Sequence, residues 1–137
     1  MKSAMNTTRI HHLKLNKIAW LFVTTLYMMI LIYVSTKPAD AGHTPSTAEQ
    51  VAHNLCHIPA YAILFYLLMH CFTAFNFVAQ TNSFVVTVVF GAVNEWLQNF
   101  IPSRTASVSD MMLNAVGAGL MLWLMINQYK KNNEART

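Results

Sequence analysis

Residues 18–36 read IAWLFVTTLYMMILIYVST, a run of 19 residues that contains no charge. A helix that spans a bilayer needs about 20 mostly apolar residues, so this stretch predicts one membrane span. The uncharged run from Gln50 to Asn94 is 45 residues long, too long for one helix, and a polar cluster at residues 76–83 divides it into two spans. Another uncharged run, residues 111–129, supplies a fourth.

The sequence therefore predicts an all-α polytopic membrane protein with four transmembrane helices in an up-down bundle. The expected segments are a basic tail at 1–17, spans at about 18–36, 58–77, 83–101 and 110–129, an outer loop at 37–57, and a basic tail at 130–137. The second span is expected to begin near Pro59, because the missing N–H of proline costs nothing at a helix start. A membrane β-barrel would need segments of alternating hydrophobicity, whereas these runs are solidly apolar.

Charged residues are scarce and lie mostly in the two tails. They make up 10% of the chain, whereas a soluble globular domain has roughly 25%. Only five lie between Pro38 and Tyr129: Asp40, Glu49, Glu95, Arg104 and Asp110. The apolar content of 55% excludes a disordered chain. Nucleic-acid binding is not expected despite the net charge of +4, because the basic residues are confined to the tails.

The distribution of Lys and Arg predicts the orientation of the bundle. The N-terminal tail carries four of them and the C-terminal tail three, whereas the first and third connections carry one each, Lys37 and Arg104. Cytoplasmic segments carry the excess of these residues, so both termini are predicted to be cytoplasmic.

The first apolar segment could instead be a cleaved signal peptide. Ala39 and Ala41 flank one residue before Gly42, as in a small-x-small cleavage site. The apolar core of about 18 residues is longer than the 7–15 of a signal peptide, which favours retention as a span. Cleavage would leave three spans with the same outward face.

The predicted third span carries a polar face near its outer end. Glu95, Gln98 and Asn99 follow one another at helical spacing, which places them on one side of the helix. Glu95 lies six residues from the expected end at Ile101, about 9 Å along the axis. A carboxylate that faces hydrocarbon costs a few kcal/mol, so this face is expected to turn toward the bundle.

The predicted fourth span carries a second polar face at its start. Asp110, Asn114 and Gly117 have the i, i+4, i+7 spacing of one helix face, and Ser107 or Ser109 is a suitable N-cap. In an antiparallel bundle this face lies at the same depth as that of the third span.

Three more residues are expected at that depth. His57 and Tyr61 lie in the first turns of the second span, and Arg104 lies in the turn between the third and fourth spans. Arg104 could pair with Glu95, Asp110 or both. All of these groups are predicted to converge in the outer leaflet.

The same residues could serve only to hold the helices together. Interhelical hydrogen bonds in membranes are worth about 0.6–2 kcal/mol each, and Ala115 and Gly119 offer a small-residue face for close packing. This structural interpretation suits three amides: Gln98, Asn99 and Asn114. It suits Glu95 less, because an intramembrane carboxylate is by default a candidate functional group. His70, in mid-helix and away from the cluster, is expected to be a core residue.

The chain resembles the VanZ-like family of small bacterial membrane proteins in the string Glu95-x2-Gln98-x5-Arg104-x2-Ser107-x2-Asp110-x3-Asn114-x2-Gly117, preceded by His57-x3-Tyr61. It departs from the family at His53 and Asn54, where an Asp-Lys pair is usual. The family takes its name from a protein associated with low-level resistance to teicoplanin, which acts outside the cytoplasmic membrane. The resemblance implies a multi-pass protein of the bacterial inner membrane.

The leading functional hypothesis is an outward-facing polar pocket that binds a membrane lipid headgroup or a lipid-linked cell-envelope precursor. Such binding would affect teicoplanin susceptibility or envelope homeostasis. The expected ligand-binding residues are His57, Tyr61, Glu95, Gln98, Arg104, Ser107, Asp110 and Asn114.

Two other hypotheses belong to different classes. A membrane-embedded enzyme could use His57 and Glu95 as acid–base groups on a lipid-linked substrate, although the sequence has no established catalytic motif. A structural subunit would use the cluster only for packing. No cofactor and no metal site is predicted: His57, Glu95 and Asp110 are suitable ligand types, but isolated ligands on separate helices are a weak pattern.

Overall fold

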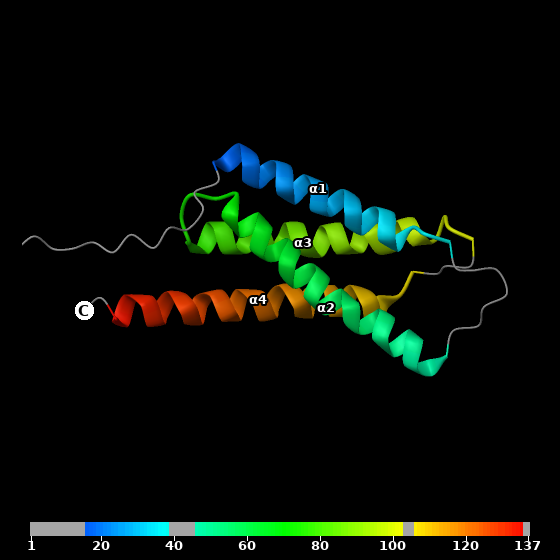
Figure 1. Ribbon diagram of the computed structural model, residues 1–137. Coiled ribbons are helices and arrows are strands. Elements are labelled where there is room, and N and C mark those ends of the chain that lie inside the picture. Colours follow the sequence, from blue (N-terminus) through cyan, green and yellow to red (C-terminus); the bar gives the residue numbers. More distant parts are fainter. Residues whose placement is uncertain (1–15, 39–45, 103–105, 136–137) are drawn as a thin grey trace, which may run out of the picture.

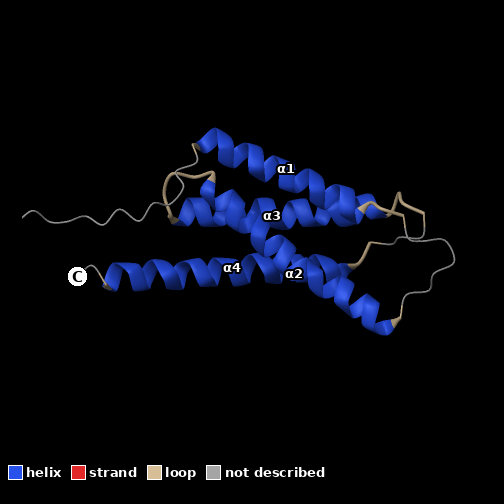
Figure 2. Cartoon of the chain, in the orientation of Figure 1, coloured by secondary structure: helices blue, strands red, loops and turns tan. Residues whose placement is uncertain are grey.

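The computed structural model describes residues 16–38, 46–102 and 106–135. These residues form four helices and no strand: α1 (Lys17–Ser35), α2 (Thr47–His70), α3 (Phe77–Gln98) and α4 (Val108–Glu134). Figure 2 draws the described residues between the helices as loops and turns. All four helices are long and apolar enough to cross a membrane. The predicted all-α fold with four spans is confirmed.

Successive helices run in opposite directions (Figure 1). The start of α1, the α2–α3 connection and the end of α4 lie at one end of the bundle, and the start of α2, the end of α3 and the start of α4 lie at the other. α2 crosses the bundle obliquely and contacts all three other helices, α4 most extensively. α2 is therefore the central element of the fold.

The second helix begins earlier than the sequence prediction placed it. α2 starts at Thr47, so the second half of the expected outer loop at 37–57 is helical, and Pro59 lies inside the helix rather than at its start. A capping box explains this start: Glu49 N donates to Ser46 Oγ at 3.3 Å, and Ser46 N donates to Glu49 Oε2 at 2.7 Å.

The connection between the second and third helices is also displaced. α2 ends at His70, whereas α3 begins at Phe77, within the polar cluster that was expected to separate the spans. Asn76 supplies the N-cap, because its Oδ1 accepts a hydrogen bond from Ala79 N at 2.9 Å. The polar residues of this cluster thus form the first turns of α3.

The other helix ends differ by smaller amounts. α3 ends at Gln98 rather than 101, so Glu95 lies one turn from the end, about 4.5 Å rather than 9 Å. α4 continues past residue 129 into the predicted basic tail and ends at Glu134, because exposed charged residues can extend a helix beyond its apolar part.

The interior divides into an apolar half and a polar half. Near the α2–α3 connection, a core is buried with apolar neighbours around it: Phe65, Met69, Ala79 and Ala118, surrounded by Phe75, Phe84, Met121, Leu122 and Met125. Large apolar side chains cover much of the outer surface, for example Phe22, Val89 and Trp123. This surface is suited to contact with lipid.

The backbones of α2 and α4 come into contact at Gly117. A Cβ at this position would overlap the carbonyl oxygen of Ile58 and lie 3.1 Å from Ile58 Cα, so the backbones of α4 and α2 touch here. A Cβ added at Gly119 would have no neighbour within 4 Å. The expectation that Gly119 lies on a face of close helix packing is therefore wrong, because no other helix lies against it.

A buried polar cluster as the candidate functional site

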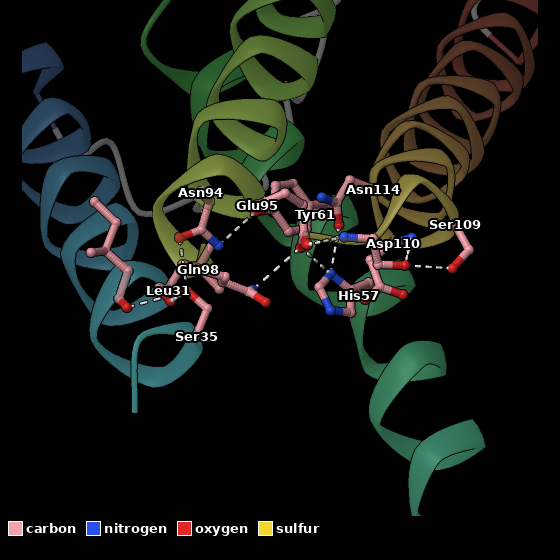
Figure 3. Close-up of polar contacts among 12 residues, drawn as sticks. Leu31, Ser35, His57, Tyr61, Asn94, Glu95, Gln98, Ser109, Asp110 and Asn114 are labelled. Carbon is pink, nitrogen blue, oxygen red and sulfur yellow. Dashed lines mark hydrogen bonds and ion pairs between the residues drawn. The ribbon is translucent and has the colours of Figure 1, made fainter. Parts of the chain in front are cut away.

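Three ionisable side chains from three helices meet at the end of the bundle where α2 and α4 begin. His57 of α2, Glu95 of α3 and Asp110 of α4 are 9%, 0% and 7% exposed. One ligand atom from each lies within 4.8 Å of the other two. Figure 3 shows these side chains directed toward the space between the helices. We call these three residues the ionisable triad.

His57 is held by a buried amide. Its Nδ1 lies 2.8 Å from Asn114 Oδ1 and 3.9 Å from Glu95 Oε1. Because an amide oxygen can only accept a hydrogen bond, Nδ1 of the imidazole carries the hydrogen. Nδ1 is thus the ring nitrogen that faces both Asn114 and Glu95.

Glu95 joins the end of α3 to the start of α4. Gln98 Nε2 donates to Glu95 Oε1 at 3.4 Å, and Ser107 N donates to Glu95 Oε2 at the same distance. Ser107 is also the N-cap of α4, and its Oγ accepts a hydrogen bond from Asp110 N at 3.3 Å. The positive end of the α4 dipole lies here and favours negative charge.

Asp110 follows its N-cap serine by three residues, as Glu49 follows Ser46, but its side chain behaves differently. Glu49 accepts from the backbone N–H of its cap residue. Asp110 is buried instead, and its Oδ1 has no hydrogen-bond partner within the described ranges. Asn114 Nδ2, which is also buried, likewise has no partner there. The cluster thus contains both an acceptor and a donor that are unsatisfied.

Tyr61 connects the cluster to the rest of the bundle. Asn94 Nδ2 donates to Tyr61 Oη at 3.2 Å, and Ser35 Oγ of α1 donates to Asn94 Oδ1 at 2.7 Å (Figure 3). The rings of Tyr61 and His57 are nearly parallel, with centroids 6.2 Å apart. This chain of contacts ties α1 to α2 through α3.

Seven of the eight predicted site residues come together, and the eighth, Arg104, lies outside the described residues. The seven are His57, Tyr61, Glu95, Gln98, Ser107, Asp110 and Asn114. Whether they bind a ligand stays a prediction. His53, at the position of the family departure, lies one turn before His57, with ring centroids 5.7 Å apart.

Asn94 takes the place in the cluster that was expected for Asn99. Asn94 is 2% exposed, whereas Asn99 lies on the surface and accepts a hydrogen bond from Ala106 N at 2.9 Å. The expectation for Asn99 was wrong, because α3 ends before it. A sequence signal existed: Asn94 lies three residues after Gly91 and four before Gln98, the spacing of one face of a helix.

The expectation that His70 is a core residue in mid-helix was wrong, because it is the last residue of α2 and is only half-buried. Its Nδ1 lies 2.8 Å from Tyr66 O, and its ring packs against Trp20 with centroids 4.5 Å apart. It is thirteen residues from His57, about 20 Å along the helix.

Comparison with known proteins gives one match. The family model described as VanZ/LLP1 matches residues 3–128, nearly the whole chain. No curated protein and no solved structure showed a significant match.

Proposed function

Because this chain belongs to the VanZ/LLP1 family, we propose that it binds the polar headgroup of a membrane lipid or lipid-linked cell-envelope precursor beside the ionisable triad. The observation that carries this proposal is the burial of His57, Glu95 and Asp110 together, beside side-chain atoms of Asp110 and Asn114 that lack hydrogen-bond partners. We further propose that this binding affects susceptibility to teicoplanin.

The energetics of the cluster favour binding over packing alone. A buried polar atom without a partner costs about 1–3 kcal/mol, so a cluster that served only stability would satisfy Asp110 Oδ1 and Asn114 Nδ2. The other half of the bundle is packed by apolar residues such as Phe65 and Met69. The fold therefore has an alternative to polar packing, and the polar end is better explained by a ligand.

The orientation supports a site in the outer leaflet. The start of α1 and the end of α4 lie at the end of the bundle opposite the triad (Figure 1). Their tails carry most of the Lys and Arg residues, which favours a cytoplasmic location for that end. The triad would then face outward, where lipid-linked envelope precursors are used and where teicoplanin acts.

The start of α4 offers a suitable environment for a phosphate group. Backbone N–H groups and the helix dipole favour an anion at a helix N-terminus. Arg104 precedes this helix in sequence and would neutralise phosphate, while Ser107 at the cap would donate its hydroxyl hydrogen. The carboxylates of Glu95 and Asp110 oppose an anion, so the site requires a compensating positive charge.

Native mass spectrometry of the full chain, extracted in its native lipid, tests this proposal. We expect a lipid that stays bound to the wild-type protein and is at least about tenfold depleted in Arg104→Ala and Glu95→Gln, as for loss of a charged contact worth 1.5–3 kcal/mol. His70→Gln, at the far end of α2, is the matched control and should retain it. Equal retention in all four proteins would contradict the proposal.

A second candidate function rests on the proximity of His57 and Glu95. Nδ1 and Oε1 are 3.9 Å apart, close enough for an acid–base pair that tightens when a substrate binds. The protein would then convert a lipid-linked substrate rather than only bind it. Incubation of purified protein with such lipids distinguishes the two functions: turnover that is lost in Glu95→Gln supports the enzyme, and unchanged lipid supports binding alone.

A further inference from the structure

We propose that the ionisable triad of His57, Glu95 and Asp110 binds one divalent metal ion. The three ligand atoms come from three different helices and lie within 4.8 Å of one another, and all three residues are at least nine-tenths buried. The proposal concerns the site of the proposed function but does not depend on it, because metal binding can be measured without lipid.

The distances are close to those that a single ion requires. Ligands about 2.1 Å from a tetrahedral ion lie about 3.4 Å apart. The most distant pair of the triad, at up to 4.8 Å, must therefore close by roughly 1.4 Å, which rotation of the Glu95 and Asp110 side chains would supply.

Asp110 provides an independent sign of a missing ligand. Its Oδ1 is buried and has no hydrogen-bond partner among residues 16–38, 46–102 and 106–135. Glu49 occupies the equivalent position after a serine N-cap and bonds back to that cap, so capping does not explain why the Asp110 carboxylate turns inward. A cation beside Oδ1 would offset the cost of burying this charge.

His57 presents Nδ1 to the triad. This nitrogen lies 3.9 Å from Glu95 Oε1 and 2.8 Å from Asn114 Oδ1. A metal ion binds imidazole through the lone pair of a ring nitrogen, so an ion in the triad would replace the hydrogen bond between His57 and Asn114.

The ligand types indicate which ions would bind. One imidazole and two carboxylates suit Zn²⁺, Mn²⁺ or Fe²⁺ better than Ca²⁺, which takes six to eight oxygen ligands. Three protein ligands leave a coordination position open on a tetrahedral ion. A phosphate oxygen of a lipid headgroup could occupy it, so the ion would provide the positive charge that the proposed function requires.

Titration of the full chain in detergent, stripped with a chelator and freed of lipid, tests the proposal with Zn²⁺ and Mn²⁺ as probes. We expect one ion per chain by calorimetry and by elemental analysis. Asp110→Asn and His57→Gln should each weaken binding by more than about 100-fold, because loss of a ligand costs more than the 10–100-fold lost with an outer-shell partner. Glu134→Gln and His70→Gln are the matched controls and should bind as the wild type does.

Wild-type protein that binds neither ion, or Asp110→Asn that binds equally well, would overturn the proposal. X-ray absorption at the metal edge of the loaded wild type needs no variant: one imidazole nitrogen among oxygen ligands supports the triad, and sulfur ligation or oxygen ligands alone would overturn it. Lipid retention is measured separately. Metal binding with equal lipid retention in every variant would contradict only the proposed function. Lipid that is lost from the variants of the site, in a protein that binds no metal, would contradict only the metal site.

Discussion

At the scale of single residues, Gly117 sets the distance between α4 and the central helix. A Cβ here would overlap the carbonyl oxygen of Ile58, one residue after His57 in α2. Glycine at 117 therefore allows α4 to bring Asp110 and Asn114 close to His57. The contact couples backbone packing directly to the geometry of the ionisable triad.

Replacing Gly117 with Ala is expected to destabilise the protein by about 1–3 kcal/mol, the usual cost of overpacking. Gly119→Ala is the matched control, because a Cβ at that position meets no atom within 4 Å and alanine favours the helix. Thermal unfolding in detergent micelles measures both. Equal unfolding temperatures for the two variants would show that α2 and α4 do not depend on this close contact.

Residue-level prediction from the sequence succeeded where helical spacing alone decides which face a side chain occupies. Asp110, Asn114 and Gly117 share a buried face of α4 as expected. It failed for Asn99, because its position depends on where α3 ends, and that end is set by contacts with the following loop, including the bond from Ala106 N to Asn99 Oδ1. The unsatisfied Asp110 Oδ1 could not be foreseen, since it depends on all neighbouring side chains.

At the scale of helices, the length of the apolar runs was enough to predict their number but not their limits. A span shows as a run without charge, whereas a helix ends where its backbone groups are capped. The Ser46-x-x-Glu49 pattern is a sequence signature of a capping box, and it marks the start of α2 eleven residues before the span expected at 58. Caps rather than hydropathy locate these helix ends.

The early start of α2 changes the position of His57 in the fold. His57 does not lie in the first turn but follows ten helical residues, and Pro59 lies two residues beyond it. Proline removes the hydrogen bond to Leu55 O, and a freed carbonyl is tolerated in membrane helices when neighbours compensate. Hydrogen bonding of α2 is thus interrupted next to the triad.

At the scale of the whole molecule, apolar and polar buried residues occupy different halves of the bundle along its length. Apolar residues such as Phe65 and Ala118 fill the half that includes the α2–α3 connection, and the ionisable triad occupies the other half. The proposed function requires the polar end to face outward. The orientation of the bundle is therefore the property of the whole molecule on which the proposal depends.

Cysteine labelling tests the orientation. In a background with Cys56→Ser and Cys71→Ser, Ala48→Cys probes the exposed start of α2, and Thr73→Cys probes the exposed connection at the other end. A membrane-impermeant maleimide added to spheroplasts should label Ala48→Cys at once and Thr73→Cys only after permeabilisation, because the basic tails favour the cytoplasm. The reverse pattern would show that the triad faces inward.

The central claim is that the ionisable triad is retained to bind a ligand rather than to stabilise the bundle. Asp110→Asn tests it most directly, because it removes one charge and almost no volume. The change removes repulsion between two buried carboxylates and loses only about 0.3–1 kcal/mol of interaction with the helix dipole. Thermal unfolding of the purified chain, free of metal and added lipid, should give Asp110→Asn an unfolding temperature equal to or above that of the wild type. A clear decrease would mean that the carboxylate stabilises the empty protein and would contradict the account.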